Sequence, residues 1–367
     1  ASFSCDFQGR GSVVDVSGLL ELSEMDVDYP AREIAASNLS LSLPYAYRFG
    51  ETTAGPSREQ VEDWGEMSWS SMTLPTGKMQ AGAMTPALAA NVFHTRGHQR
   101  IPLPGGMVIL GPVRLDEPFS KVNVHLETSA VLKSLDLSRL PTGGIALSGE
   151  VAGKFPTITA DTERLDAIGE VQGTFFGGVL EARGVGMLRP FSTGRVYGLE
   201  EMSITGIELE PLSQSLDIGL ITGRLDIGLM NYRQSFGQPV AFEISAESRE
   251  VEGVPQKVSL KAVNSISVMG TGSGLGDVGV GMFSSFFETF SYEAIGIYCS
   301  LQNDVFRVRG LIDQGDVEYL IKKPLFFGIN VINRNPNNRI SFSDMVERVQ
   351  RVVGDETDVK VNPKEES

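Results

Sequence analysis

The chain has 367 residues, which allows one large domain or two ordinary ones, and 41% are apolar, enough for a sizeable core. These values exclude a disordered chain. Its 31 Lys and Arg against 46 Asp and Glu give a net charge of −15, which argues against binding to nucleic acid and against membrane docking through a basic patch. With 41 Gly, 18 Pro and 8% aromatic residues, the composition favours many turns and a β-rich fold.

Alternation of apolar and polar residues begins near the N-terminus, where Val14, Val16, Leu20 and Leu22 alternate with mostly polar neighbours. A period of two buries one face of a sheet. The pattern recurs at residues 122–127, 224–229, 242–247 and 257–262, with turn residues between the segments. We therefore predict one long antiparallel meander. Periodicity alone does not separate an open trough from a sandwich.

The alternation fades between residues 55 and 118, where we predict an irregular excursion rich in Gly, Pro and Met, with a short helix over residues 85–90. Further on, Phe283, Phe286, Phe287 and Phe290 have helical spacing, and they predict a helix with an aromatic stripe. A second helix is predicted near the C-terminus, starting at the Ser341 and Asp344 signal. We divide the chain into residues 1–140, residues 141–354 and a charged tail, 355–367, expected to be disordered.

No run of about 18 apolar residues predicts a membrane-spanning helix. The first residue is Ala rather than Met, which suggests a processed product or a piece of a longer chain. The two cysteines, Cys5 and Cys299, could pair only if the fold brings them together. Cys299 lies in a predicted strand, where a buried, unreactive thiol is expected.

Motifs that could carry chemistry are weak in this sequence. Residues 274–279 fit the string G-x-G-x-x-G, but predicted antiparallel neighbours favour a flexible turn over a dinucleotide site. His94 and His98 have the i, i+4 spacing of a metal site, yet nothing completes a ligand set, so surface histidines are expected. We find no catalytic constellation, and we predict neither an enzyme nor a cofactor or metal.

The second half resembles a known family. Residues 190–192, 202–214, 217–226, 237–240, 258–262 and 266–274 are similar to the C-terminal region of YdbH-like members of the AsmA-like superfamily. The most specific part is the Asn-rich stretch LFFGINVINRNPNNRIS, residues 325–341. The resemblance covers about residues 140 to 353.

This resemblance implies a bridge-like phospholipid transporter of a Gram-negative-type periplasm, with no catalytic role. The implied fold is a mainly β chain whose long curved antiparallel sheet forms an open trough or partly closed barrel, with a few short helices, one near the C-terminus. Residues 141–354 would be the family's β-trough, continuing the sheet of residues 1–140. The family pattern includes an inner-membrane helix, absent here, and a small outer-membrane lipoprotein that can add strands at a sheet edge.

The expected ligands are phospholipid acyl chains held by inward apolar side chains. The groove-lining candidates are Leu225, Ile227, Leu229, Phe242, Ile244, Val258, Leu260, Phe283, Phe286, Phe287 and Phe290. For the Phe residues, ordinary core packing is the competing interpretation. Two alternative functions remain: a structural or assembly module of the cell envelope that pairs by β-strand addition, and an enzyme using the 274–279 loop.

Overall fold

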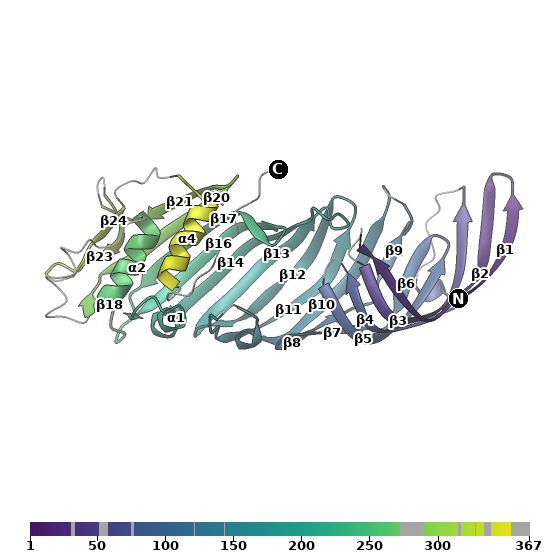
Figure 1. Ribbon diagram of the computed structural model, residues 1–367, viewed down its shortest axis with the longest axis horizontal. Helices are drawn as coiled ribbons and strands as arrows, with labels where there is room; N and C mark the ends of the chain where they lie inside the picture. Colours follow the sequence, from purple (N-terminus) through teal and green to yellow (C-terminus); the bar gives the residue numbers. More distant parts are fainter. Residues whose placement is uncertain are drawn as a thin grey trace, which may run out of the picture.

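The computed structural model describes residues 1–30, 34–50, 58–74, 77–120, 122–142, 144–271, 289–314, 317–326, 328–333 and 339–353. Strands make up 65% of the structure, and nearly all of them join one long antiparallel sheet that is not closed (Figure 1). Three short helices accompany the sheet, one near the C-terminus. The prediction of a mainly β chain with a long open sheet is confirmed.

The sheet falls into three sections along the chain. The N-terminal section contains β1 (Ser2–Arg10), β2 (Val13–Tyr29), β3 (Ile34–Phe49), β4 (Glu66–Leu74), β5 (Gly77–Ala89), β6 (Val92–Arg96), β7 (Gln99–Leu103), β8 (Gly106–Leu110) and β9 (Arg114–Asp116). The middle section contains β10 (His125–Asp136), β11 (Gly149–Ala160), β12 (Arg164–Phe175), β13 (Gly178–Leu188), β14 (Val196–Glu208), β16 (Arg224–Ser235) and β17 (Gln238–Arg249). The C-terminal section contains β20 (Ala294–Gln302), β21 (Val305–Gly310), β22 (Ile312–Gln314), β23 (Val317–Lys322), β24 (Val331–Asn333) and β25 (Ile340–Ser341).

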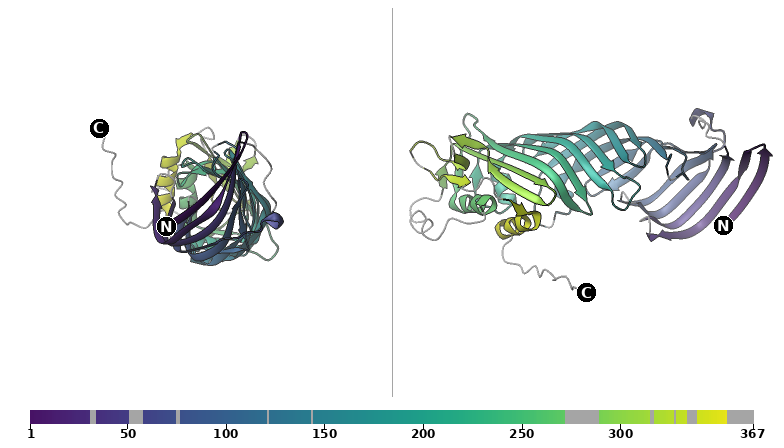
Figure 2. Two further views of the ribbon diagram at one scale, coloured as in Figure 1. Left: turned by 90° about the vertical axis from the view of Figure 1, so that its right-hand side faces the viewer. Right: turned by 90° about the horizontal axis from the view of Figure 1, so that it is seen from above.

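The remaining elements lie mostly at the C-terminal end of the molecule. They are the helices α1 (Leu209–Ser215), α2 (Leu260–Thr271) and α4 (Phe342–Val353), and a small sheet of β15 (Ile221–Thr222), β18 (Lys257–Ser259) and β19 (Thr289–Ser291). Single 3-10 turns occupy Arg58–Gln60 and Leu137–Arg139. Figure 2 shows α2 and α4 at the end of the molecule opposite β1.

Neighbouring strands are mostly consecutive in the chain, and every pairing except one is antiparallel. The exception joins β3 to β5 over Tyr45 and Ala46, where β3 extends beyond its pairing with β4. Viewed along the long axis, the strands curve into an arc (Figure 2). Nowhere in the described pairings does β1 meet the C-terminal strands, so the arc stays open.

Two-residue turns set the register of this meander. Ala90-Asn91, Phe176-Gly177, Phe236-Gly237 and Asn303-Asp304 all have positive φ at both residues, the backbone of type I′ hairpins. These turns match the right-handed twist of the strands they join. The helix predicted over residues 85–90 is wrong, because these residues end β5 and enter the first of these turns. The irregular excursion predicted over 55–118 is likewise wrong, because β4 to β9 lie within it.

The strand predicted over residues 257–262 continues for only three residues before a helix begins. The Ser259 hydroxyl accepts a hydrogen bond from the Ala262 N–H at 3.2 Å, which caps the first turn of α2. Ala262 and Val263 are both fully buried, and so is Val258 just before the helix. Burial on several sides of a helix mimics the alternation of a strand, which explains why the sequence predicted a strand through Leu260 and Ala262.

Of the other two predicted helices, the one at the C-terminus is present, whereas the one with the aromatic stripe does not extend to Phe290. Phe290 lies on strand β19, opposite Val258, so no helical stripe extends to it. Phe283, Phe286 and Phe287 lie outside the described residues, as do the 274–279 loop and the tail 355–367. The C-terminal helix is confirmed as α4, and the Ser341 hydroxyl accepts a hydrogen bond from the Asp344 N–H at 3.1 Å.

Candidate functional site

An unbroken row of mostly apolar residues runs across the concave face of the sheet. Directly opposed residues on neighbouring strands point to the same side, so the strand register identifies the members of this row. The apolar row comprises Cys5, Gly18, Tyr45, Leu88, Phe93, Leu115, Leu126, Ala160, Leu165, Met187 and Tyr197. It crosses ten junctions between strands without a charged residue.

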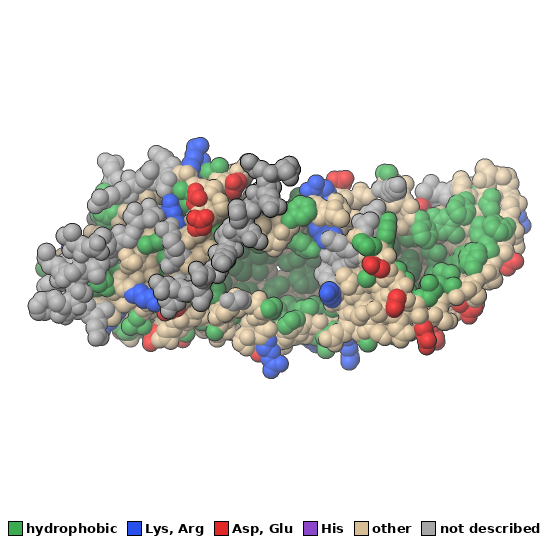
Figure 3. All heavy atoms as spheres, in the orientation of Figure 1, with side chains coloured by type: hydrophobic (Ala, Val, Ile, Leu, Met, Phe, Trp, Pro, Cys, Tyr) green, Lys and Arg blue, Asp and Glu red, His purple; other side chains and the backbone are tan. Residues whose placement is uncertain are grey.

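A second row continues the apolar face towards the C-terminal end. Its members are Val171, Ala182, Met202, Leu229, Ile244, Cys299 and Val308, again in direct register. Leu199, opposite Val185 and two residues from Tyr197, packs against the same buried cluster as these residues. The two rows therefore lie on one face. Figure 3 shows this face hollowed, with apolar side chains gathered over β1 to β3 and in the middle of the molecule.

The face is open at its N-terminal end. Phe3 and Phe7 are 65% and 71% exposed, and on the same side of β3 Phe49 is also exposed. Phe3 stacks on Tyr45 with ring centroids 5.6 Å apart, and Tyr47 contacts both Phe49 and Phe119. These aromatic rings give the open section a large apolar surface that no described element covers.

The C-terminal end of the same face is filled. Leu225 and Phe242 are buried, and Phe242, Phe306 and Phe342 form a three-ring cluster that anchors α4 to the sheet. Ile227, Leu229 and Ile244 are half-buried against the same core. These candidates do point inward, but they share their face with the packed helices. The accessible groove therefore lies further towards the N-terminus than the sequence predicted.

Val258, Leu260 and Phe290 do not line the sheet at all. Val258 and Phe290 pair within the small three-stranded sheet, and Leu260 begins α2. They belong to the packed C-terminal end. The residues that sequence reasoning missed are those of the apolar row in β3 to β13. Their signal was the period-two alternation, which indicated strands but not which strands share a continuous face.

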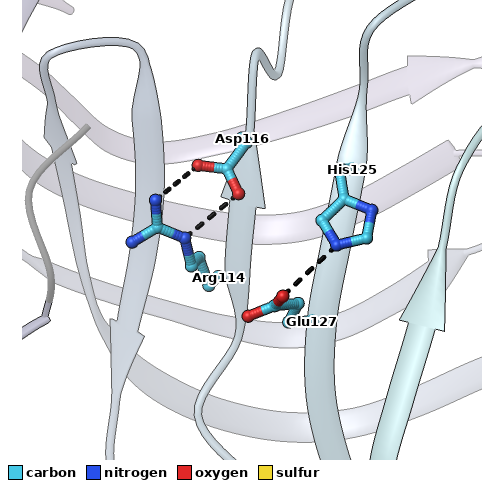
Figure 4. A network of polar contacts seen from close by, with 4 residues as sticks. All are labelled: Arg114, Asp116, His125 and Glu127. Atoms are coloured by element: carbon cyan, nitrogen blue, oxygen red, sulfur yellow. Dashed lines mark hydrogen bonds and ion pairs between the residues drawn. The ribbon is translucent and has the colours of Figure 1, made fainter. Parts of the chain in front are cut away.

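The convex face has the opposite chemistry. On β9 Arg114 pairs with Asp116 at 2.6 Å, and on β10 His125 lies 3.3 Å from Glu127 (Figure 4). Further along, Arg183 pairs with Glu201 and Arg224 with Glu208. The first two pairs lie within single strands and the last two join neighbouring strands. All four keep the outer side polar, so the two faces of one sheet differ sharply.

Two tyrosines of the open groove stay uncharged at neutral pH. Burial and the neighbouring Cys5 thiol raise the pKa of Tyr45 to about 12, and its hydroxyl donates to the Ser4 carbonyl at 2.9 Å. Gly18 lies directly beneath, where a Cβ would come 2.8 Å from that hydroxyl. Burial and the nearby Glu117 also raise the pKa of Tyr47. Neither tyrosine places a charge on the apolar face.

His94 is not the surface residue that the sequence predicted. It is 1% exposed, and Arg96, on the same side of β6, lies over the Trp64 ring at 4.8 Å. The segment before β4 therefore covers this part of the outer face. His98 is exposed. Among the described residues no group of three His, Cys, Asp or Glu side chains could hold a metal ion.

The two cysteines are free and lie on different sections of the concave face. Burial raises the pKa of the Cys299 thiol to about 12, so almost no thiolate forms below that pH. The raised pKa agrees with the expected unreactive thiol, although Cys299 is half-buried rather than fully buried. Cys5 is also half-buried, but it belongs to the open groove, whereas Cys299 packs against the core.

We therefore expect iodoacetamide at about pH 8 to modify Cys5 at least ten times faster than Cys299 in the native protein. Peptide mass spectrometry after timed quenching measures the two rates. In urea both should react alike, which controls for intrinsic reactivity. Equal rates in the native state would contradict the packing of β20 against β17 and β21.

Comparison with protein-family models, with curated proteins and with solved structures gives no match. Among the described residues, no helix is long and apolar enough to cross a membrane.

Proposed function

We propose that the protein is a non-catalytic carrier of phospholipid, which holds acyl chains against the concave face of its sheet and lets them move along it. The observation that supports this is the apolar row, which continues from β1 to β14 on an open face without a charged side chain. Movement along such a surface needs no catalytic residue and no cofactor.

The energetics of this proposal are those of apolar burial. Each methylene removed from water contributes about 0.8 kcal/mol, so an acyl chain gains stabilisation wherever it lies in the groove. The open side of the arc leaves a polar headgroup in water, where its hydration is not lost. Because successive strands present a similar apolar surface, the affinity for an acyl chain stays similar along the groove. The acyl chain can therefore slide from strand to strand.

The proposed location is the periplasm of a Gram-negative-type envelope, between the inner and outer membranes. It follows from the resemblance to YdbH-like proteins, and the net charge of −15 would disfavour adhesion to anionic headgroups outside the groove.

The direct test is organic extraction of the purified, detergent-free protein followed by lipid mass spectrometry. We expect at least one phospholipid per protein, whereas a lipid-free protein would contradict the proposal. A denatured and refolded sample, incubated with phosphatidylethanolamine, should regain the same stoichiometry. This control separates specific retention from carry-over during purification.

One observation favours a second function, that of an assembly module. Among the described strands β1 pairs only with β2, so its other edge carries unpaired N–H and C=O groups without a bulge, lysine or proline to protect it. A partner, such as a small outer-membrane lipoprotein, could add a strand there. A lipid-free protein that forms a stable complex, lost on proline substitution in β1, would favour this alternative.

A further inference from the structure

The two most exposed large apolar side chains of the described residues are neighbours in one loop. Leu325 is 91% exposed and Phe326 is 84% exposed, in the segment between β23 and β24. A folded protein gains nothing in water from two adjacent exposed side chains of this size. They mark a contact surface that no other described residue fills.

The loop that carries these side chains has a fixed base. The Lys323 N–H donates to the Asn330 side-chain oxygen at 2.8 Å, which closes the loop across its stem. Gly328 has φ +143°, and a Cβ there would come 2.7 Å from the Lys323 side chain. Lys322 is held by Glu293 at 2.6 Å. The base therefore holds Leu325 and Phe326 out into solvent.

The position of the loop in the molecule is equally specific. β23 and β24 lie at the end of the elongated molecule, opposite the end formed by β1 (Figure 1). The loop is thus beyond the packed helices that fill this end of the groove.

We propose that Leu325 and Phe326 insert into the interfacial region of a lipid bilayer and hold this end of the molecule against it. Apolar side chains close to an unpaired lysine suit this region, because the lysine stem lies along the acyl boundary while its ammonium group reaches the phosphates. Lys323 forms no ion pair with a described residue, so its charge is available for a phosphate. The inference builds on the proposed function, for which it supplies the membrane contact.

A bilayer fits this tip better than a protein does. A stable protein interface buries about 800 Å² on each partner. The described part of the loop offers only two exposed apolar side chains, followed by Gly328 and the exposed Asn330. Two apolar side chains can insert into the interfacial region of a bilayer without a binding surface of complementary shape.

The test is flotation with vesicles of phosphatidylethanolamine and phosphatidylglycerol. We expect Leu325→Ser combined with Phe326→Ser to lower the bound fraction at least ten-fold, because both inserting groups are lost. Phe236→Ser is the matched control, since Phe236 is 81% exposed but lies in the β16–β17 turn. It should bind like the unaltered protein. Equal binding of all three proteins, or no binding by any of them, would overturn the inference.

A second measurement reports how deeply the loop inserts into the bilayer. Phe326→Trp should be quenched by brominated lipids in these vesicles, whereas Phe236→Trp should not, after subtraction of the signal from Trp64 and Trp69. Absence of quenching at position 326 would also overturn the inference. Bound phospholipid should be unchanged in the double serine variant. A protein that floats through this loop but retains no lipid would refute the carrier function and leave the membrane contact standing.

Discussion

Replacing Leu165 and Met187 together by aspartate should interrupt the groove in its middle. These residues face each other on β12 and β13 within the apolar row, and both are only half-buried. Two hydrated carboxylates deny an acyl chain contact over at least two methylenes, a loss of roughly 1.6 kcal/mol that corresponds to more than ten-fold. We expect transfer of a fluorescent phospholipid between vesicles to fall by at least that factor.

The matched control places the same charges on the other face of the same strands. Ile168 on β12 and Val179 on β13 are exposed, and Val179 alternates with buried Leu180. Ile168→Asp combined with Val179→Asp should therefore leave transfer unchanged. Circular dichroism checks that both variants are folded. Equal loss of transfer in the two variants would attribute the effect to net charge and refute a path along the concave face.

A substitution in the packed part of the concave face should cause a large loss of folding stability. Ile207 on β14 is fully buried opposite Leu225, within the cluster that closes the C-terminal end of the groove. Ile207→Ala should lower the free energy of unfolding by about 2 to 5 kcal/mol, because it removes apolar burial and leaves a cavity.

Ile168→Ala makes the same chemical change on the exposed face and should alter stability by about 0.5 kcal/mol or less. Urea unfolding followed by circular dichroism compares the two. Hydrogen exchange locates the effect, which should be concentrated in β14, β16 and α1. A loss at Ile207 no larger than that at Ile168 would mean that the helices do not seal this end.

Strand alternation and helix caps are the features of this fold that short stretches of sequence predict. Leu225, Ile227 and Leu229 alternate in the sequence, and they alternate in β16, because a period of two needs no knowledge of neighbours. The Ser341 cap likewise predicted α4 from a short-range hydrogen bond. Ser259 gives an equivalent cap for α2, but the alternation over Val258, Leu260 and Ala262 favoured a strand there.

The sequence by itself determined the class of the fold. Alternating side chains and turn residues specify a strand meander, and the helix at the C-terminus has its own start signal. These are interactions between residues close in the chain, so they can be read without a structure.

Only the tertiary structure decided where the groove is open and where it is packed. Register across each junction, including the parallel contact of Tyr45 with Leu88, determines which apolar side chains form one continuous face. Docking of α2 and α4 then makes Phe242 core, while Phe3 and Phe7 stay exposed, although all three are inward residues of strands. The physical reason is that burial depends on what packs above a strand, and those elements come from distant parts of the chain.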